Sequence, residues 1–101
     1  MKEPIKLTNK KITFIPFNVT MTSADTEYTL TLSHVNELMI QCRTANDVRM
    51  AFVTGKVATP TEPYFTIKAG GGISFENINW VSVTLYFACS SAGKTVEILK
   101  I

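Results

Sequence analysis

The segment from Trp80 to Cys89 constrains the fold of this chain more than any other, because its apolar residues recur at every second position. One phase holds Val81, Val83, Leu85, Phe87 and Cys89, and the other holds Trp80, Ser82, Thr84, Tyr86 and Ala88. A period of two places these two sets on opposite faces of a β-strand, whereas a helix would scatter them around its circumference. We therefore predict a strand over Trp80–Cys89 whose odd-numbered positions face a core.

The other candidate strands are shorter and rich in threonine, β-branched and aromatic residues. They are Ile12–Thr22, Tyr28–Leu32, Leu38–Arg43, Val48–Thr54, Tyr64–Ala69, Ile73–Phe75 and Thr95–Ile101. Pro16 predicts a bulge or an edge strand in the first, since proline cannot donate to a ladder. Seven or eight short strands at roughly ten-residue spacing are typical of sandwiches and jelly rolls. We predict an all-β fold: a single antiparallel β-sandwich or jelly-roll-like domain over residues 12–101, preceded by a basic arm over residues 1–11.

Charge is scarce and unevenly distributed. Charged residues make up 18% of the 101 residues, against about 25% in an average domain. This fits either a surface partly covered by neighbouring subunits or a thin sandwich with little surface for charge. The net charge of +2 is too small to indicate a nucleic-acid binder. Residues 1–11 carry four lysines and one glutamate, a balance of +3, so the remaining 90 residues sum to −1. Lys10 and Lys11 are candidate contacts to an acidic partner surface; the alternative is a solvated terminus.

Targeting signals are not evident in the sequence. The first residues lack the apolar stretch of a signal peptide, and no apolar run approaches the roughly 20 residues of a membrane helix. Cys42 and Cys89 are too few for a disulfide scaffold. We expect a protein that is neither secreted nor bound to a membrane, made in a reducing compartment.

Residue types that carry chemistry occur singly. His34 is the one histidine and is expected to be a surface turn residue, because a multi-histidine metal site needs partners. Cys42 and Cys89 fall in apolar phases, which predicts small buried hydrophobes, with a disulfide between them as the other interpretation. Gly70–Gly72 predicts a tight turn. The sequence therefore predicts no enzyme, no metal and no cofactor.

The link Ala45–Asp47 suggests a hairpin between the third and fourth strands. A three-residue loop pairs Cys42 with Met50 and Ile40 with Phe52, which keeps one face apolar; a two-residue loop would mix apolar and polar residues. In this register Arg43 and Arg49 are cross-strand neighbours on the outer face, where like charges repel. We expect them to contact an acidic group of a partner; alternatively, Asp47 or a sheet neighbour neutralises them.

Three aromatic residues are candidate interface anchors. Trp80 and Tyr86 occupy the phase opposite the apolar one and are expected to face outward, as is Tyr64 in the fifth strand. Exposed Trp, Tyr and Arg are enriched at interface hot spots, and aromatic rings also form sugar-binding platforms. The alternative is a strand buried on both faces, with Trp80 in the core.

Several segments from Tyr28 onward form a recognisable pattern: Tyr28–Leu32 (YTLTL), Gln41–Arg49 (QCRTANDVR), Ala51–Phe52, Pro63–Lys68 (PYFTIK), Val83–Ala88 (VTLYFA), Ser90–Gly93 (SSAG) and Val96–Ile98 (VEI). Through these residues about three-quarters of the chain resembles small accessory proteins of tailed-phage virions, in particular auxiliary capsid proteins of phages related to the gut crassviruses. The basic arm falls outside it.

The resemblance implies a β-sandwich that decorates or cements the head shell, with no substrate and no cofactor. The implied partners are the major capsid protein or other virion subunits, and self-association as a homo-oligomer is left open. The implied location is the phage head, after synthesis in the bacterial cytoplasm. The alternative function is a carbohydrate-binding module that uses exposed aromatic residues.

Overall fold

The computed structural model describes residues 13–43 and 45–101, which form eight β-strands and no helix. The strands are β1 (Ile15–Met21), β2 (Tyr28–Val35), β3 (Leu38–Cys42), β4 (Val48–Ala51), β5 (Phe65–Ile67), β6 (Gly72–Phe75), β7 (Trp80–Cys89) and β8 (Lys94–Lys100). The strand predicted over Trp80–Cys89 is confirmed residue for residue. Several predicted strands are shorter in the structure, most of all the fourth and fifth, since β4 ends at Ala51 and β5 covers three residues, whereas β2 continues to Val35.

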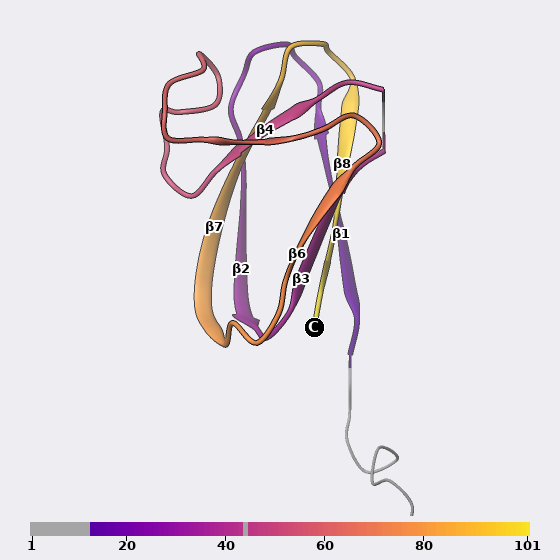
Figure 1. The fold of residues 1–101 in the computed structure, drawn as a ribbon, viewed down its shortest axis with the longest axis vertical. Helices are drawn as coiled ribbons and strands as arrows, with labels where there is room; N and C mark the ends of the chain where they lie inside the picture. The colour runs from indigo at the N-terminus through magenta and orange to yellow at the C-terminus, as the bar shows by residue number, and fades with distance from the viewer. Residues whose placement is uncertain (1–12, 44) are drawn as a thin grey trace, which may run out of the picture.

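The strands form two four-stranded antiparallel sheets (Figure 1). Sheet A has the order β1-β8-β3-β6, and sheet B has the order β2-β7-β4-β5. Each strand of the first half pairs with one of the second: β1 with β8, β2 with β7, β3 with β6 and β4 with β5. This is the pairing of one long hairpin rolled into two layers, which is a jelly roll. The predicted all-β, jelly-roll-like sandwich is confirmed.

The core lies between the two sheets and takes alternate residues from each strand. In β3, Leu38, Ile40 and Cys42 are buried while Met39 and Gln41 are exposed, as their alternation predicts. Sheet B contributes Leu85 and Phe87, both fully buried. These side chains leave water together, so the apolar phase of each strand determines which face of each sheet points inward.

Both cysteines are free and buried, which confirms their prediction as small hydrophobes. The Cys42 thiol donates to the carbonyl of Ile67 at 3.4 Å, and the Cys89 thiol donates to the carbonyl of Asp47 at 3.4 Å. Burial raises the pKa of the Cys42 thiol, which keeps it protonated and able to donate.

Two predictions about local backbone are also confirmed. The strand that contains Pro16 is at the edge of sheet A, where β8 is its one strand partner. Gly70 has a φ of 71° and the amide of Gly71 donates to the carbonyl of Lys68 at 2.7 Å, so the glycines form a tight turn before β6. His34 is exposed as expected, although it lies in β2 rather than in the following turn.

The predicted hairpin between the third and fourth strands is wrong. β3 pairs with β6 and β8 in sheet A, whereas β4 pairs with β5 and β7 in sheet B. The chain therefore crosses from one sheet to the other between them. The apolar faces that we expected to lie side by side instead face each other across the core, which buries both equally well. Arg43 and Arg49 are consequently on different sheets and are not cross-strand neighbours.

The predicted orientations of Trp80 and Val81 are also wrong. Trp80 is half-buried and packs on the core, whereas Val81 is 74% exposed. The cause is a break in alternation in β2, where His34 has a left-handed φ of 52°. The next residue, Val35, is buried, and Trp80 pairs with it. Paired residues share a face of the sheet, so Trp80 points inward with Val35.

The central position of Phe87 provides a test of this core. We expect Phe87→Ala to lower the free energy of unfolding by about 3–5 kcal/mol, because it removes a buried ring and leaves a cavity. Val81→Ala is the matched control in the same strand and should change it by less than about 0.5 kcal/mol. Urea denaturation measures both. Equal effects of the two substitutions would contradict the assignment of the core face.

Candidate interaction surfaces

Arg49 holds a loop against the outer face of sheet B. Its Nε donates to the carbonyl of Val57 at 2.6 Å, and one terminal nitrogen contacts the carboxylate of Asp25 at 2.8 Å and the carbonyl of Ala58 at 3.3 Å. The Arg49 side chain is only 13% exposed. The predicted contact between Arg49 and a partner is therefore replaced by contacts within the chain, and the charge of Arg49 is neutralised by Asp25 from the turn between β1 and β2.

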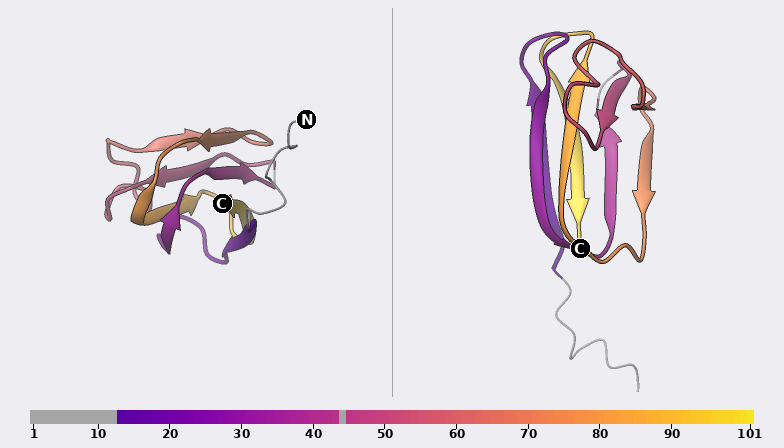
Figure 2. Two further views of the ribbon diagram at one scale, coloured as in Figure 1. Left: turned by 90° about the horizontal axis from the view of Figure 1, so that it is seen from below. Right: turned by 90° about the vertical axis from the view of Figure 1, so that its left-hand side faces the viewer.

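The same loop, residues 52–64, has two further attachments to sheet B. The carboxylate of Glu27 accepts from the hydroxyl of Thr54 at 2.6 Å and from the amide of Gly55 at 2.9 Å. Val57 is fully buried with Ala51 and Ala88, and Tyr64 and Tyr86 pack around them. Figures 1 and 2 show this loop at the upper end of the molecule, beside β7. Tyr64 and Tyr86 are thus on the outer face, as predicted, but they are partly buried by the loop.

The rest of the outer face of sheet B carries hydroxyl groups. Thr31 and Thr84 pair across β2 and β7 with a hydrogen bond of 3.1 Å. Thr29, Ser33 and Ser82 are exposed in the same two strands. Sheet B therefore presents polar side chains to solvent where the loop does not cover it.

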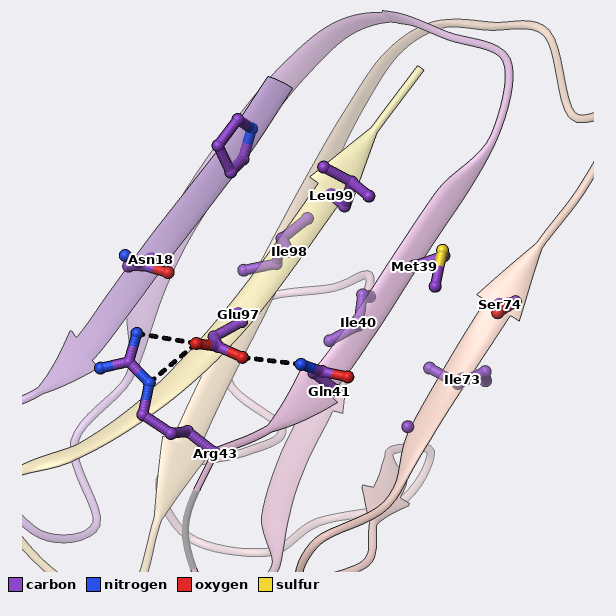
Figure 3. Close-up of a pocket in the computed structure, with 12 residues that line it drawn as sticks. Asn18, Met39, Ile40, Gln41, Arg43, Ile73, Ser74, Glu97, Ile98 and Leu99 are labelled. Carbon is purple, nitrogen blue, oxygen red and sulfur yellow. Dashed lines mark hydrogen bonds and ion pairs between the residues drawn. The ribbon is translucent and has the colours of Figure 1, made fainter. Parts of the chain in front are cut away.

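The outer face of sheet A is open and mixed in character. Two rows of side chains cross its four strands: Pro16, Leu99, Met39 and Ser74 form the first, and Asn18, Glu97, Gln41 and Gly72 form the second. These rows line a hollow of about 440 Å³ (Figure 3). Gly72 leaves one side of it without a side chain, since a Cβ there would lie 2.8 Å from the carbonyl oxygen of Ile40.

A hydrogen-bonded network marks the polar end of this hollow. Arg43 donates from Nε and from a terminal nitrogen to one oxygen of Glu97, both at 2.8 Å. Gln41 donates to the other oxygen at 2.7 Å (Figure 3). These donors, with Gln41 contributing most, hold the pKa of Glu97 below its ordinary value of 4.5. The expectation that a sheet neighbour neutralises Arg43 is confirmed, although its side chain remains 51% exposed.

A second open surface is an aromatic cluster between the two sheets. The ring of Phe52 lies 6.2 Å from Phe75 and 5.9 Å from Trp80, and Phe75 lies 5.7 Å from Trp80. Phe52 is 47% exposed. Phe65 is equally exposed and lies in β5 opposite Met50, two residues before Phe52. The cluster forms where β4 and β5 end early and leave β6 and β7 uncovered.

Within residues 13–43 and 45–101, no three His, Cys, Asp or Glu side chains gather to hold a metal ion. In the same residues every buried side-chain nitrogen and oxygen has a hydrogen-bond partner. The described residues also form no helix long and apolar enough to cross a membrane.

The structure separates the predicted site residues rather than bringing them together. Arg43 is on sheet A, Arg49, Tyr64 and Tyr86 surround the loop on sheet B, and Trp80 is in the aromatic cluster. Lys10 and Lys11 lie outside the described residues. Sequence reasoning did not select Phe52, Phe65 or Met39 as candidate site residues, although all three are exposed. For Met39 the alternation of Leu38–Cys42 already indicated an outward position.

Comparisons with known proteins bear on the fold alone. No family model and no curated protein matches the chain. Among solved structures, the chain is similar to a de novo designed double-stranded β-helix solved by solution NMR, at a TM-score of 0.50 and 12% identity. The match covers 88% of this chain and 97% of that one. This likeness agrees with the two-layer pairing of the strands.

The two arginines make a matched pair for mutation. We expect Arg49→Gln to lower the free energy of unfolding by about 1–3 kcal/mol, because it leaves backbone carbonyls of the loop without their charged donor. Arg43→Gln, in an exposed ion pair, should cost less than about 1 kcal/mol. Amide exchange should accelerate in residues 54–61 of Arg49→Gln alone. Unchanged exchange there would mean that Arg49 does not hold the loop.

The lowered pKa of Glu97 predicts a dependence of stability on pH. Because the carboxyl titrates lower in the folded protein than in the unfolded chain, its stabilising contribution is present above pH 4.5. That contribution is lost as the pH falls through the folded pKa. The wild type should therefore exceed Glu97→Gln in stability at neutral pH, and the difference should disappear in strong acid. Denaturation of both proteins across this range measures it, and a constant difference would refute it.

Proposed function

We propose that the protein is a non-enzymatic structural subunit of a phage virion, which binds the assembled head shell as an auxiliary or decoration protein. Its partners are the major capsid protein or other virion subunits, and its place is the phage head. The resemblance of Tyr28–Ile98 to auxiliary capsid proteins suggests this function, and the aromatic cluster of Phe52, Phe75 and Trp80, together with the exposed Phe65 in β5, supports it. Aromatic side chains are enriched at protein interfaces and provide large contact areas.

The position of the cluster favours a protein partner. Phe52 and Phe65 are about half exposed, and Phe52 rests on the rings of Phe75 and Trp80, which pack on the core. A ring supported in this way loses little side-chain freedom when a partner covers it. The loop that begins at Phe52 is attached to sheet B through Arg49 and Glu27, so the chain that follows Phe52 is positioned before binding. Many copies on a fixed lattice add avidity, so each contact need only be modest.

The alternative function, carbohydrate binding through exposed aromatic rings, fits this geometry less well. Phe52 meets Phe75 and Trp80 at interplanar angles of 79° and 76°. Rings that meet nearly at right angles do not form a flat platform for a sugar ring, and Trp80 is half-buried beneath them.

Cosedimentation with particles that lack this protein tests the proposal. We expect saturable binding at a fixed number of copies per major capsid subunit. Phe52→Ser and Phe65→Ser should each weaken it about tenfold or more, the loss typical of an interface anchor. Val81→Ser is the matched control, since it removes an exposed apolar side chain outside the cluster, and it should bind as the wild type does.

Two outcomes would count against the proposal. If the wild-type protein fails to bind particles while a glycan saturably quenches the fluorescence of Trp80, the chain is a carbohydrate-binding module. If Val81→Ser weakens binding to particles as much as Phe52→Ser, the aromatic cluster is not the contact. Thermal unfolding of each variant verifies that the fold is intact.

A further inference from the structure

The backbone hydrogen bonds of β3 determine which groups of β6 face outward. β3 lies between β8 and β6 and bonds to each of them through alternate residues, as a middle strand of an antiparallel sheet does. Glu37 and Ile101 exchange backbone hydrogen bonds of 3.3 and 3.0 Å, which assigns the odd-numbered residues of this segment to β8. The amide of Cys42 donates to the carbonyl of Gly71 at 2.9 Å, which assigns the even-numbered residues to β6.

Gly72 and Ser74 present their backbone groups at the free edge of β6. Ile73 and Phe75 pair with even-numbered residues of β3, so their N–H and C=O groups bond to that strand. The groups of Gly72 and Ser74 therefore point the opposite way, out from the sheet. Within the residues that the structure describes, β3 is the one strand partner of β6. Figure 2 shows β6 at the outer edge of the molecule in its right-hand view.

The other edge strands of the two sheets are interrupted or short, whereas β6 is not protected in these ways. Pro16 in β1 has no N–H to offer, His34 in β2 has a left-handed φ of 52°, and β5 covers three residues. β6 contains no proline and no charged residue, and its outward-bonding positions carry only a glycine and a serine. Natural sheets usually protect their edges against added strands. The edge of β6 is therefore suited to pairing with another strand.

We propose that β6 pairs antiparallel with β6 of a second copy of this chain, which joins the two sheets A into one continuous sheet about a two-fold axis. The outward N–H and C=O groups of Gly72 and Ser74 then exchange hydrogen bonds with those of the other copy. A two-fold dimer requires a surface that is complementary to itself, and β6 meets this condition in its charges and in its apolar residues. The inference goes beyond capsid binding and does not depend on it.

The charges at the two ends of β6 are complementary in this arrangement. Lys68 precedes the strand, and its side chain is 79% exposed, with an ion pair to Asp47 at 3.4 Å. Glu76 follows the strand, is exposed, and has no ion pair within the described residues. Antiparallel pairing brings the end of one strand beside the start of the other, so these opposite charges approach each other twice about the two-fold axis. Parallel pairing would instead set like charges together.

The inner face of β6 selects one register for this pair. Ile73 and Phe75 pack on the core and are half-buried. With Ser74 opposite Ser74 of the other copy, Ile73 of each copy lies opposite Phe75 of the other, and both pairs continue the apolar inner face. With Ile73 opposite itself, Phe75 would lie opposite Gly71, which has no side chain to cover the ring. The two-fold axis is therefore at Ser74.

Sedimentation equilibrium of the full chain tests the dimer. We expect the wild type to reach twice the mass of one chain as its concentration rises. Ser74→Pro should weaken the dimer about tenfold or more, because it removes an outward N–H at the two-fold axis without removing a hydrogen bond to β3. Asn18→Pro is the matched control, since its N–H shares the outward phase of Pro16 at the opposite edge of the same sheet, and its dimer should persist. Thermal unfolding verifies that both variants are folded.

Disulfide trapping at the two-fold axis tests the register. In Ser74→Cys the two new thiols lie directly opposite each other, at a Cα–Cα separation of about 5.5 Å that suits a disulfide. We expect this variant to form a disulfide between chains about tenfold or more faster than Ser82→Cys, whose thiol is exposed on sheet B. Cys42 and Cys89 are buried and present in every variant, and the wild type provides their background.

Charge exchange tests the antiparallel direction of the pair. Glu76→Lys should weaken the dimer about threefold to tenfold, because it sets a second positive charge beside Lys68 of the other copy. Adding Lys68→Glu reverses both ends of the strand and should restore the dimer. Failure of the second substitution to restore it would overturn the antiparallel arrangement.

Three further outcomes would overturn the proposal. The first is a wild-type protein that stays monomeric up to about 1 mM, the limit of weak association. The second is a dimer that Ser74→Pro and Asn18→Pro affect equally, which would place the contact elsewhere. The third is a monomeric protein in which Ser74→Pro weakens binding to particles, since the edge would then take a strand of a capsid subunit. The dimer itself is measured without particles, so its failure is distinct from a failure of capsid binding.

Discussion

Each sheet of this protein has one apolar face, and the two faces can leave water only by packing on each other. Ile40 and Ile98 from sheet A meet Leu85 and Phe87 from sheet B in one buried cluster. Every strand that contributes to this cluster must present its other phase to the outside. Surfaces for partners are therefore confined to the two outer faces and to the side where β4 and β5 are short. The loop of residues 52–64 already covers part of one outer face, which leaves sheet A and the aromatic cluster open.

Local alternation predicted the strands and their buried phases, but it could not predict which strands pair. The pattern of Leu38–Cys42 gave the correct inward residues, and that of Val48–Ala51 did so as well. A hairpin and a crossover between sheets satisfy this pattern equally, because either arrangement buries both apolar faces. Whether the hairpin or the crossover forms depends on strand partners far along the chain, since Cys42 pairs with Val96 and Val48 pairs with Cys89. No short-range signal in residues 43–47 distinguishes the two arrangements.

The exposure of single side chains at the candidate sites could likewise not be predicted from the local sequence alone. Trp80 and Val81 exchanged their predicted exposure because His34 adopts a left-handed conformation in the neighbouring strand. A histidine in a strand-like sequence gives little sign of this. Likewise, Arg49 looked available to a partner until the fold brought Asp25 and the carbonyl of Val57 to it. Aromatic and basic residues could thus be recognised as candidates from the sequence, whereas their availability depends on contacts that only the folded chain creates.

The chain has few charged residues, and the way in which they are paired determines where net charge remains. Arg43, Arg49 and Lys68 are each engaged by a carboxylate of the same chain, so half of the Lys and Arg residues in the described part are compensated locally. The remaining imbalance is between the segment of residues 1–11, at +3, and the rest of the chain, at −1. Attraction between them acts over about a Debye length, close to 10 Å at moderate salt. The hollow on the outer face of sheet A and the aromatic cluster share no residue, so a partner bound to the cluster leaves that hollow open.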